Sequence, residues 1–362
     1  MILFIILLFI SLIVLSINII LLASFPNFTQ KPVSTANYLN MSIVIAMKNE
    51  VKNLENLFSS LKTQNYPQDK FEVILSDDHS TDNSYQKAVE LAQGKNKFRV
   101  IKADNKKFPG KKGALDLGIT NARYPFIVIT DADCIPANNW LAGYSEKFAE
   151  NYEFLFGLAP FIQTKGIINK ISRFENLRST ILTFALTKLR LPYSAAARNM
   201  GFKKSSYENL GGFSNTMQTI SGDDDLLIRE AVNQNMKIGI VDLENSFVLS
   251  NSKTTFSEYL NQKARHTKTS MHYLPVHKLL LGYWHLSNIL TLFSLILIPL
   301  NPLFGLPFLL KICGDLIAVL FSQRRLKYNF KLYEIPLLQL IYELFLIVNF
   351  LSSFRKTIPW KS

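Results

Sequence analysis

Residues 71–82 read FEVILSDDHSTD, and this stretch decides the fold class. Its first five residues are mostly apolar, which is typical of a short buried strand. Two acids, Asp77 and Asp78, follow directly, and residues 80–82 offer N-caps for a helix that runs to about Gln93. The stretch therefore predicts a strand, an acidic turn and a helix, in that order.

The same order recurs on both sides of this stretch. Short apolar runs alternate with segments in which apolar residues return at helical spacing. We expect strands at 41–46, 71–75, 98–103 and 126–130, and helices at 50–63, 80–93 and 112–122. This alternation favours an α/β fold with a mainly parallel, Rossmann-like sheet and helices on both faces.

Acidic side chains stand where two of these strands end. Asp77 and Asp78 follow one strand, and Asp131 and Asp133 follow another. Ligands bind beyond the carboxyl ends of the strands in open parallel sheets, and clustered carboxylates there need a positive partner. Mg²⁺ or Mn²⁺ with phosphate oxygens is the usual solution. The sequence has neither a Walker A loop nor a G-x-G-x-x-G motif, so the domain is expected to bind a metal-nucleotide by another route.

Apolar residues are concentrated at both ends of the 362-residue chain. Residues 2–25 carry no charge and are long enough to span a membrane. A cleaved signal peptide is the alternative, but no Lys or Arg precedes this run, and the run is too long. About three further spans are expected, near 283–300, 303–322 and 335–353. We expect a transmembrane anchor at 1–25, a soluble domain at 41–273 and C-terminal membrane helices at 279–354.

The distribution of positive charge predicts the orientation. The formal net charge is +13, and the short loop at residues 323–331 is strongly basic, so it is expected in the cytoplasm. With four spans, the 41–273 domain of this multi-pass protein is then also cytoplasmic, and both termini lie outside. The basic tail, Arg355, Lys356 and Lys361, argues against this arrangement. A re-entrant or interfacial last segment would return the tail to the cytoplasm.

The basic excess also bears on partners. It suits anionic lipid head groups, whereas the chain has no recognised nucleic-acid motif, so we expect membrane lipids and no nucleic acid. Two cysteines, Cys134 and Cys313, exclude a disulfide scaffold and are too few for a metal cluster. They are consistent with a reducing compartment.

Charged residues inside the apolar segments define further alternatives. Lys311 and Asp315 lie four residues apart on one helix face and are able to pair. Glu343, in the last span, is either a functional acid or a protonated group in an interhelical hydrogen bond. Residues 166–191 mix apolar and basic side chains. They form either a segment at the membrane surface or a helix pair with a basic outer face.

Between residues 41 and 270 the chain resembles membrane-bound family 2 glycosyltransferases, which have the A-type nucleotide-sugar fold. The resemblance rests on several segments in order: SIVIAMKNE at 42–50, FEVILSDDHSTD at 71–82, GKKGAL at 110–115, DAD at 131–133, GGF at 211–213, GDDDL at 222–226 and QKARH at 262–266. Three positions depart from the family pattern. Ala46 stands where the family usually has Pro, His79 where it often has Gly, and His266 where it has Trp.

The resemblance implies a role for each acid. It places the catalytic base at Asp224, with Asp223 beside it. Asp133 and Asp131 would hold Mg²⁺ or Mn²⁺, and Asp131 would also face the nucleoside. One of Asp77 and Asp78 would accept a hydrogen bond from the base. Helix capping is the alternative for these acids, because carboxylates near a helix N-terminus are favourable without any ligand.

Basic and polar residues complete the implied site. Lys111 could reach the nucleotide or its phosphates, or simply be an exposed lysine at a helix start. Gln262 and Arg265 lie one helical turn apart, and an Arg fork suits a diphosphate. Residues 198–203 resemble the segment where acceptors are expected.

Together these features predict an inverting, metal-dependent glycosyltransferase. It would move a sugar from a nucleoside-diphosphate sugar to a lipid-linked or glycan acceptor at the cytoplasmic membrane face. Three alternatives stay open: a processive polysaccharide synthase, a membrane nucleotidyltransferase, and a non-catalytic membrane scaffold. The short membrane block and His266 favour non-processive transfer.

Overall fold

The computed structural model describes residues 1–30 and 38–355. These residues divide into two compact units. The sheet unit comprises Asn27–Ile162 and Pro192–Asn251. The helical unit comprises Met1–Pro26, Gln163–Leu191 and Ser252–Ser362, of which residues 356–362 lie outside the described part. Residues 163–191 and 252–273, which the sequence assigns to the soluble domain, thus group with the apolar helices.

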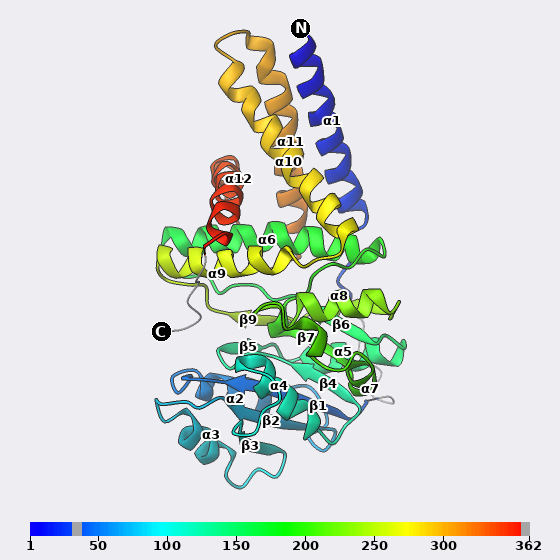
Figure 1. Cartoon of the computed structure of the whole chain (residues 1–362), viewed down its shortest axis with the longest axis vertical. Coiled ribbons are helices and arrows are strands. Elements are labelled where there is room, and N and C mark those ends of the chain that lie inside the picture. Colours follow the sequence, from blue (N-terminus) through cyan, green and yellow to red (C-terminus); the bar gives the residue numbers. More distant parts are fainter. Residues whose placement is uncertain (31–37, 356–362) are drawn as a thin grey trace. The chain divides into compact units, whose positions relative to one another are not determined.

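The sheet unit is built around one seven-stranded sheet with the order β3-β2-β1-β4-β7-β6-β8 (Figure 1). The bounds of its strands are β1 Met41–Met47, β2 Phe71–Asp77, β3 Phe98–Lys102, β4 Phe126–Ile129, β6 Phe154–Gly157, β7 Met200–Lys203 and β8 Ile238–Val241. Strands β1 to β4 are parallel to one another, and β7 runs antiparallel to both its neighbours. A second small sheet pairs β5, Cys134–Pro136, with β9, Val248–Ser250.

Helices cover both faces of the large sheet. Alternate residues of β1 enter different cores: Ile43 and Ile45 pack with α2 and α5, and Val44 packs with α4 and α8. Strands buried on both faces are therefore mostly apolar, which is the pattern seen in the sequence. The helices of this unit are α2 Leu54–Lys62, α3 Ser84–Ala92, α4 Gly110–Thr120, α5 Trp140–Ala149, α7 Lys204–Asn209 and α8 Asp225–Asn233.

The predicted elements of residues 41–130 are confirmed, with small shifts at their ends. Helix α2 begins at Leu54 rather than at residue 50. The reason is that the N–H groups of Glu50 and Val51 donate to Ser84 and Asp82 instead of starting a helix. This contact joins the loop after β1 to the loop after β2.

The helical unit contains four helices long and apolar enough to cross a membrane. They are α1 Ile2–Ala23, α10 Pro275–Leu297, α11 Gly305–Ser322, which continues the short turn Pro302–Phe304, and α12 Glu334–Ser353. Many of their large apolar side chains are exposed, as expected for lipid-facing positions. Two further helices complete this unit: α6 Ile167–Lys188 and α9 Phe256–Ser270.

Residues 166–191 form the single helix α6 rather than a helix pair. Arg173 and Arg178 are buried on it, so the expected basic outer face is not formed at these positions. The predicted pairing of Lys311 with Asp315 is present, at 2.6 Å.

Candidate active site

The acids of the first motif lie at the carboxyl edge of the sheet, as the sequence predicts. Asp77 is the last residue of β2 and is buried, and its Oδ2 accepts a hydrogen bond from the Ser80 N–H at 3.2 Å. The backbone N–H of Asp78 donates to the Met47 carbonyl at the end of β1, at 2.8 Å. The end of β2 is therefore held firmly against the end of β1.

Asp78 forms an ion pair that the sequence did not suggest. Its side chain is buried and pairs with Lys106, from the loop before α4. His79 is solvent-facing and lies 3.6 Å from Asp78 and 3.8 Å from Asp104. The carboxylate thus has positive charge beside it.

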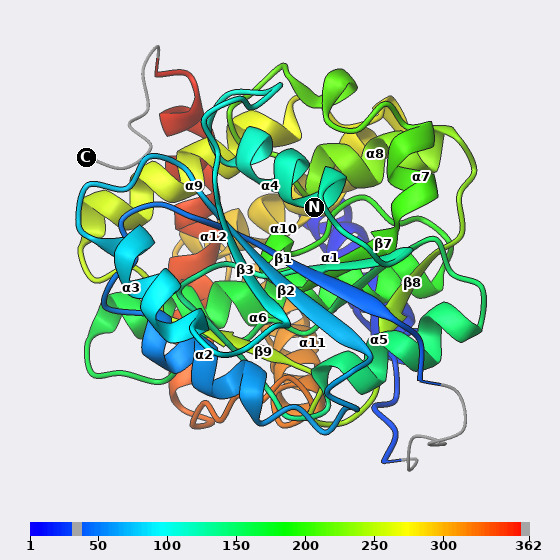
Figure 2. The ribbon, with the colours of Figure 1, turned by 90° about the horizontal axis from the view of Figure 1, so that it is seen from below.

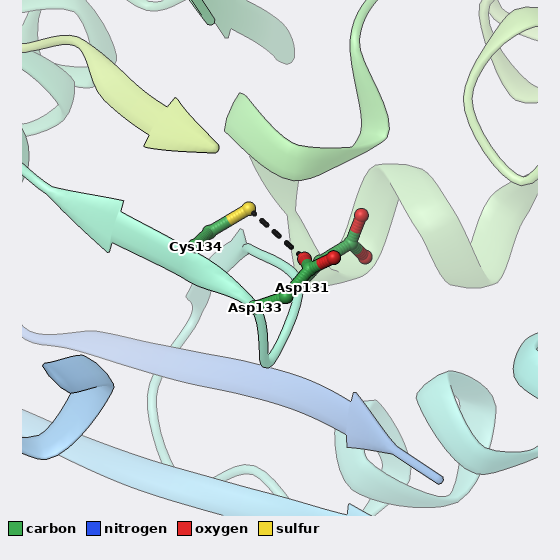
Figure 3. Close-up of side chains that lie close together, drawn as sticks. All are labelled: Asp131, Asp133 and Cys134. Carbon is green, nitrogen blue, oxygen red and sulfur yellow. Dashed lines mark hydrogen bonds between the residues drawn. The ribbon is translucent and has the colours of Figure 1, made fainter. Parts of the chain in front are cut away.

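The second acidic motif follows β4, which is two strands away from β2, or about 10 Å. Asp131, Asp133 and Cys134 offer one ligand atom each, and these atoms all lie within 4.8 Å of one another (Figure 3). The Cys134 thiol donates to Asp133 Oδ1 at 3.5 Å. Burial raises the pKa of this thiol well above its ordinary value, and the two carboxylates raise it further.

Lys111 joins this motif to the third one. Its Nζ lies 2.7 Å from Asp131 Oδ1 and 2.7 Å from Asp223 Oδ2. Burial alone would lower the pKa of Lys111, but the two carboxylates raise it well above its ordinary value. The ammonium therefore holds together acids that are far apart in the sequence.

The third motif precedes helix α8. Gly222 has φ +81°, a conformation that favours glycine, and Asp224 caps the helix by accepting the Asp225 N–H at 2.8 Å. Its other oxygen accepts the Ala197 N–H at 2.9 Å. The carbonyl of the next residue, Arg198, accepts a hydrogen bond from the hydroxyl of Thr130, and Thr130 directly precedes Asp131. Asp224 therefore does cap helix α8, as the capping alternative predicts. The same contacts bring it toward the second motif.

Asp223 and Asp224 differ in their electrostatics. Burial alone would raise the pKa of Asp223, but the Lys111 ammonium lowers it below its ordinary value. Burial raises the pKa of Asp224 well above its ordinary value, and the adjacent Asp225 and Asp223 carboxylates raise it further. One carboxylate is therefore kept ionised, and its neighbour is a much stronger base.

The donor set after β4 fits a divalent cation. Asp131 and Asp133 supply carboxylate oxygens, which Mg²⁺ and Mn²⁺ prefer, and such ions commonly use one or two protein carboxylates together with phosphate oxygens. The Cys134 thiol is held protonated by its surroundings, and a protonated thiol is a poor ligand. The site is thus suited to a hard ion bound with a phosphate ligand.

Other polar residues near the motifs have structural partners. Lys112 is buried and donates to the carbonyls of Thr216 and Thr219, which fixes the loop before the third motif. Nothing in the sequence distinguishes it from neighbouring lysines. Asn199, in the segment expected to meet acceptors, accepts hydrogen bonds from Trp140 and Tyr144 and donates to the Leu158 carbonyl. It is a core residue.

Gln262 and Arg265 lie on α9, which belongs to the helical unit. The structure therefore does not place them relative to the acids of the sheet unit. Burial lowers the pKa of Arg265, although an arginine remains charged at neutral pH.

Comparison with known proteins identifies the family of residues 42–211. Residues 42–211 match the family model described as Glycosyl transferase family 2. The chain carries a family 2 glycosyltransferase domain. A solved mannosyltransferase from Pyrobaculum calidifontis, in complex with GDP-Man and Mn²⁺, is 17% identical and has a TM-score of 0.58. The comparison covers 96% of this chain and 100% of that one, and it confirms the A-type fold of the transferase domain.

Curated relatives match part of the chain. Glycosyltransferase AglE of Haloferax volcanii is 23% identical over 185 residues, which are 51% of this chain and 58% of that protein. A dolichyl N-acetyl-alpha-D-glucosaminyl phosphate 3-beta-D-2,3-diacetamido-2,3-dideoxy-beta-D-glucuronosyltransferase of Methanococcus voltae is 31% identical over 39% of this chain and 42% of that protein. The beta-monoglucosyldiacylglycerol synthase of a Nostoc species is 33% identical over 28% and 22%. The chain thus spans less than two thirds of each of these relatives.

Proposed function

We propose that this protein is an inverting, metal-dependent glycosyltransferase. It moves a sugar from a nucleoside-diphosphate sugar to a lipid-linked or glycan acceptor at the cytoplasmic membrane face. The observation that carries the proposal is the contrast between Asp223, which pairs with Lys111, and Asp224, whose pKa burial raises. A base whose pKa lies nearer the working pH is what proton removal from an acceptor hydroxyl requires.

Asp224 acts as the general base. It takes the proton of the acceptor hydroxyl while the hydroxyl oxygen forms a bond to the anomeric carbon. The bond between that carbon and the nucleoside diphosphate breaks on the opposite face, so an α-linked donor gives a β-linked product. Acceptance of the Asp225 and Ala197 N–H groups fixes the orientation of the carboxylate.

The remaining acids and Lys111 hold the donor. Asp133 and Asp131 would bind Mg²⁺ or Mn²⁺, which supplies positive charge for the departing diphosphate when it is bound. One of Asp77 and Asp78 accepts a hydrogen bond from the nucleobase. Lys111 adds a positive charge near the phosphates and keeps Asp223 ionised.

We expect the acceptor to be a lipid or a lipid-linked glycan. One relative is named for synthesis of monoglucosyldiacylglycerol and another for transfer to a dolichyl N-acetyl-alpha-D-glucosaminyl phosphate, which supports a lipid or lipid-linked acceptor here. Four apolar helices support multi-pass insertion, and the basic loop at 323–331 supports a cytoplasmic transferase domain. Gln262, Arg265 and Asp223 then serve the acceptor and the diphosphate.

The variant Asp224→Asn tests the proposal. We expect transfer to fall by about 10²- to 10⁴-fold, the usual contribution of a general base. The thermal shift caused by nucleotide-sugar with Mn²⁺ should survive, because a ligand bound only by the folded state still stabilises it. Before the variant is tested, the donor is identified from the thermal shifts that a panel of UDP- and GDP-sugars, each with and without Mn²⁺, causes in the wild type. Turnover close to that of the wild type removes Asp224 as the base.

Two labelled donors separate the proposal from its rivals. A donor labelled in the sugar should transfer its label, and a donor labelled in the nucleotide should not. The opposite result identifies a nucleotidyltransferase. Product length on a defined lipid acceptor distinguishes one addition from processive synthesis, and failure to bind any nucleotide-sugar with Mn²⁺ identifies a scaffold.

A further inference from the structure

A chain of buried charges joins the apolar helices to α6. Lys311 and Asp315 of α11 pair at 2.6 Å, and Lys311 also lies 3.1 Å from Glu343 of α12. Asp315 then pairs with Arg178 of α6 at 2.9 Å. All four side chains are buried, with exposed fractions of 5% or less. Two positive charges face two negative ones, so the group is neutral as a whole.

One turn away, α6 makes a second set of polar contacts. Glu175 accepts a hydrogen bond from the Tyr259 hydroxyl at 2.6 Å and lies 3.1 Å from Lys263 Nζ. Both partners are on α9, and Lys263 lies between Gln262 and Arg265. Glu175 and Arg178 are three residues apart on α6, so one short stretch of this helix binds α11 and α9 together.

Apolar packing alone does not explain these contacts. In lipid there is little hydrophobic force between helices, and apolar surfaces slide past one another at small cost. Buried ion pairs contribute little net stability, but they fix one register, because every displaced register leaves a charge unpaired. The charge chain is thus suited to setting where α6 and α9 lie relative to α11.

We propose that Arg178 and Glu175 are positioning residues that fix α9, and with it Gln262 and Arg265, to the membrane helix α11. The role of α9 in binding the acceptor or diphosphate rests on the function proposed above. The mechanical link does not, because all of its members lie within the helical unit.

Hydrogen exchange of the full chain in lipid nanodiscs tests the link. The double variant Arg178→Met/Asp315→Asn removes one charge of each sign and leaves Lys311 paired with Glu343, so the group stays neutral. We expect amides of α9 to exchange about tenfold faster, while those of α2, α3 and α8 are unchanged. Unchanged exchange in α9, or an equal rise in all of these helices, overturns the proposal.

Two further variants guard against simple misfolding. Glu175→Leu removes both the hydrogen bond from Tyr259 and the ion pair with Lys263, leaves the charges of Arg178, Lys311, Asp315 and Glu343 intact, and should give the same change in α9. Lys170→Gln/Glu334→Gln is the matched control. This pair also joins α6 to α12, at 2.7 Å, but it is partly exposed, and exposed pairs fix little. If the control variant accelerates amide exchange in α9 as much as the double variant does, the proposal is contradicted.

A binding measurement separates this inference from the proposed function. UDP or GDP with Mn²⁺ should bind the double variant within about twofold of the wild type, while the KM for a lipid acceptor rises about tenfold at a similar kcat. Asp315→Glu in place of Asp315→Asn, with Arg178 retained, should restore the wild-type KM. If the wild type binds neither nucleotide, the proposed function fails, and the exchange of α9 alone decides the link.

Discussion

Asp224 has a structural role and, in the proposed function, a chemical one. It caps α8 and accepts a second N–H group, which by themselves would favour the charged carboxylate. Burial and two adjacent acids outweigh these bonds and raise the pKa of Asp224. The folded protein therefore keeps a proton that the unfolded chain releases near pH 4.

A pH-dependent stability follows for Asp224. Because its folded pKa is raised, the wild type loses stability as pH rises from about 4 through that folded pKa. Asp224→Asn does not titrate, so the difference in Tm between the variant and the wild type should grow in favour of the variant over this range. Thermal unfolding from pH 5 to 9 measures the difference, with the exposed Asp69→Asn as the control for loss of a charge. A difference independent of pH contradicts the assignment.

Lys111 and Lys112 are adjacent but make different contacts: Lys111 pairs with acids, and Lys112 donates to backbone carbonyls. Lys111→Met leaves Asp131 and Asp223 facing each other, which should cost about 3 kcal/mol, as for other broken buried pairs. Mn²⁺ should then raise the Tm of this variant more than that of the wild type, because the ion replaces the lost charge. Lys112→Met releases the loop at Thr216 and Thr219 and should lower Tm without a larger response to Mn²⁺.

At the scale of single residues, the sequence indicated that acids follow the strands but did not indicate which side chains they pair with. The acids were visible because they follow apolar runs directly. Lys106 and Lys112 carried no such signal, since the chain has 40 basic residues and each of these two looks like an ordinary loop or helix position. Which of them meets an acid depends on the path of the chain in space.

Among the elements, α4 is the one whose position the site depends on most, because it carries Lys111 and Lys112. It packs directly on β1 at Gly118, where the Cβ of an alanine would lie 2.4 Å from Val44 Cγ1. Such close contact leaves no space for a side chain, so the glycine sets the distance between helix and sheet.

Gly118→Ala should therefore destabilise the transferase domain by about 1–3 kcal/mol, the usual cost of overpacking. The fall in Tm of the purified chain measures it. Gly282→Ala on α10 is the matched control: its Cβ would meet nothing within 4 Å among the described residues, so its effect should stay within about 1 kcal/mol. Equal effects of the two substitutions would show that α4 can shift freely.

The elements of the parallel half were predictable because period and burial are local properties. The antiparallel strand β7 and the single helix α6 were not predicted. The four residues of β7 are too few to show a period, and the basic residues of α6 are buried by contacts with other helices.

On the scale of the whole molecule, α12 differs from the other apolar helices. Its Tyr342 and Phe345 contact aromatic rings of α6 and α9. Figure 1 shows α1, α10 and α11 lengthwise and α12 nearly end-on, and the view in Figure 2 reverses this. Within the helical unit, α12 thus lies across the other three, as an interfacial segment does. This arrangement favours a cytoplasmic C-terminus, in agreement with the basic charge near it.

Reporter fusions test this topology. Green fluorescent protein fused after residue 331 or after residue 355 should fluoresce, because both sites are expected in the cytoplasm. Alkaline phosphatase fused after residue 300 should be active, because the α10–α11 connection is expected outside. If green fluorescent protein fused after residue 355 does not fluoresce, and alkaline phosphatase fused at the same position is active, α12 spans the membrane.

The sequence by itself determined the alternation of strands and helices, the acids at the strand ends and the apolar segments long enough for a membrane. Each of these depends on neighbours within one element, where spacing and length suffice. Only the tertiary structure decided that Lys111 joins Asp131 to Asp223 and that Arg178 meets Asp315. Which charged side chains pair depends on the distances between elements, and those distances are set by packing along the entire chain.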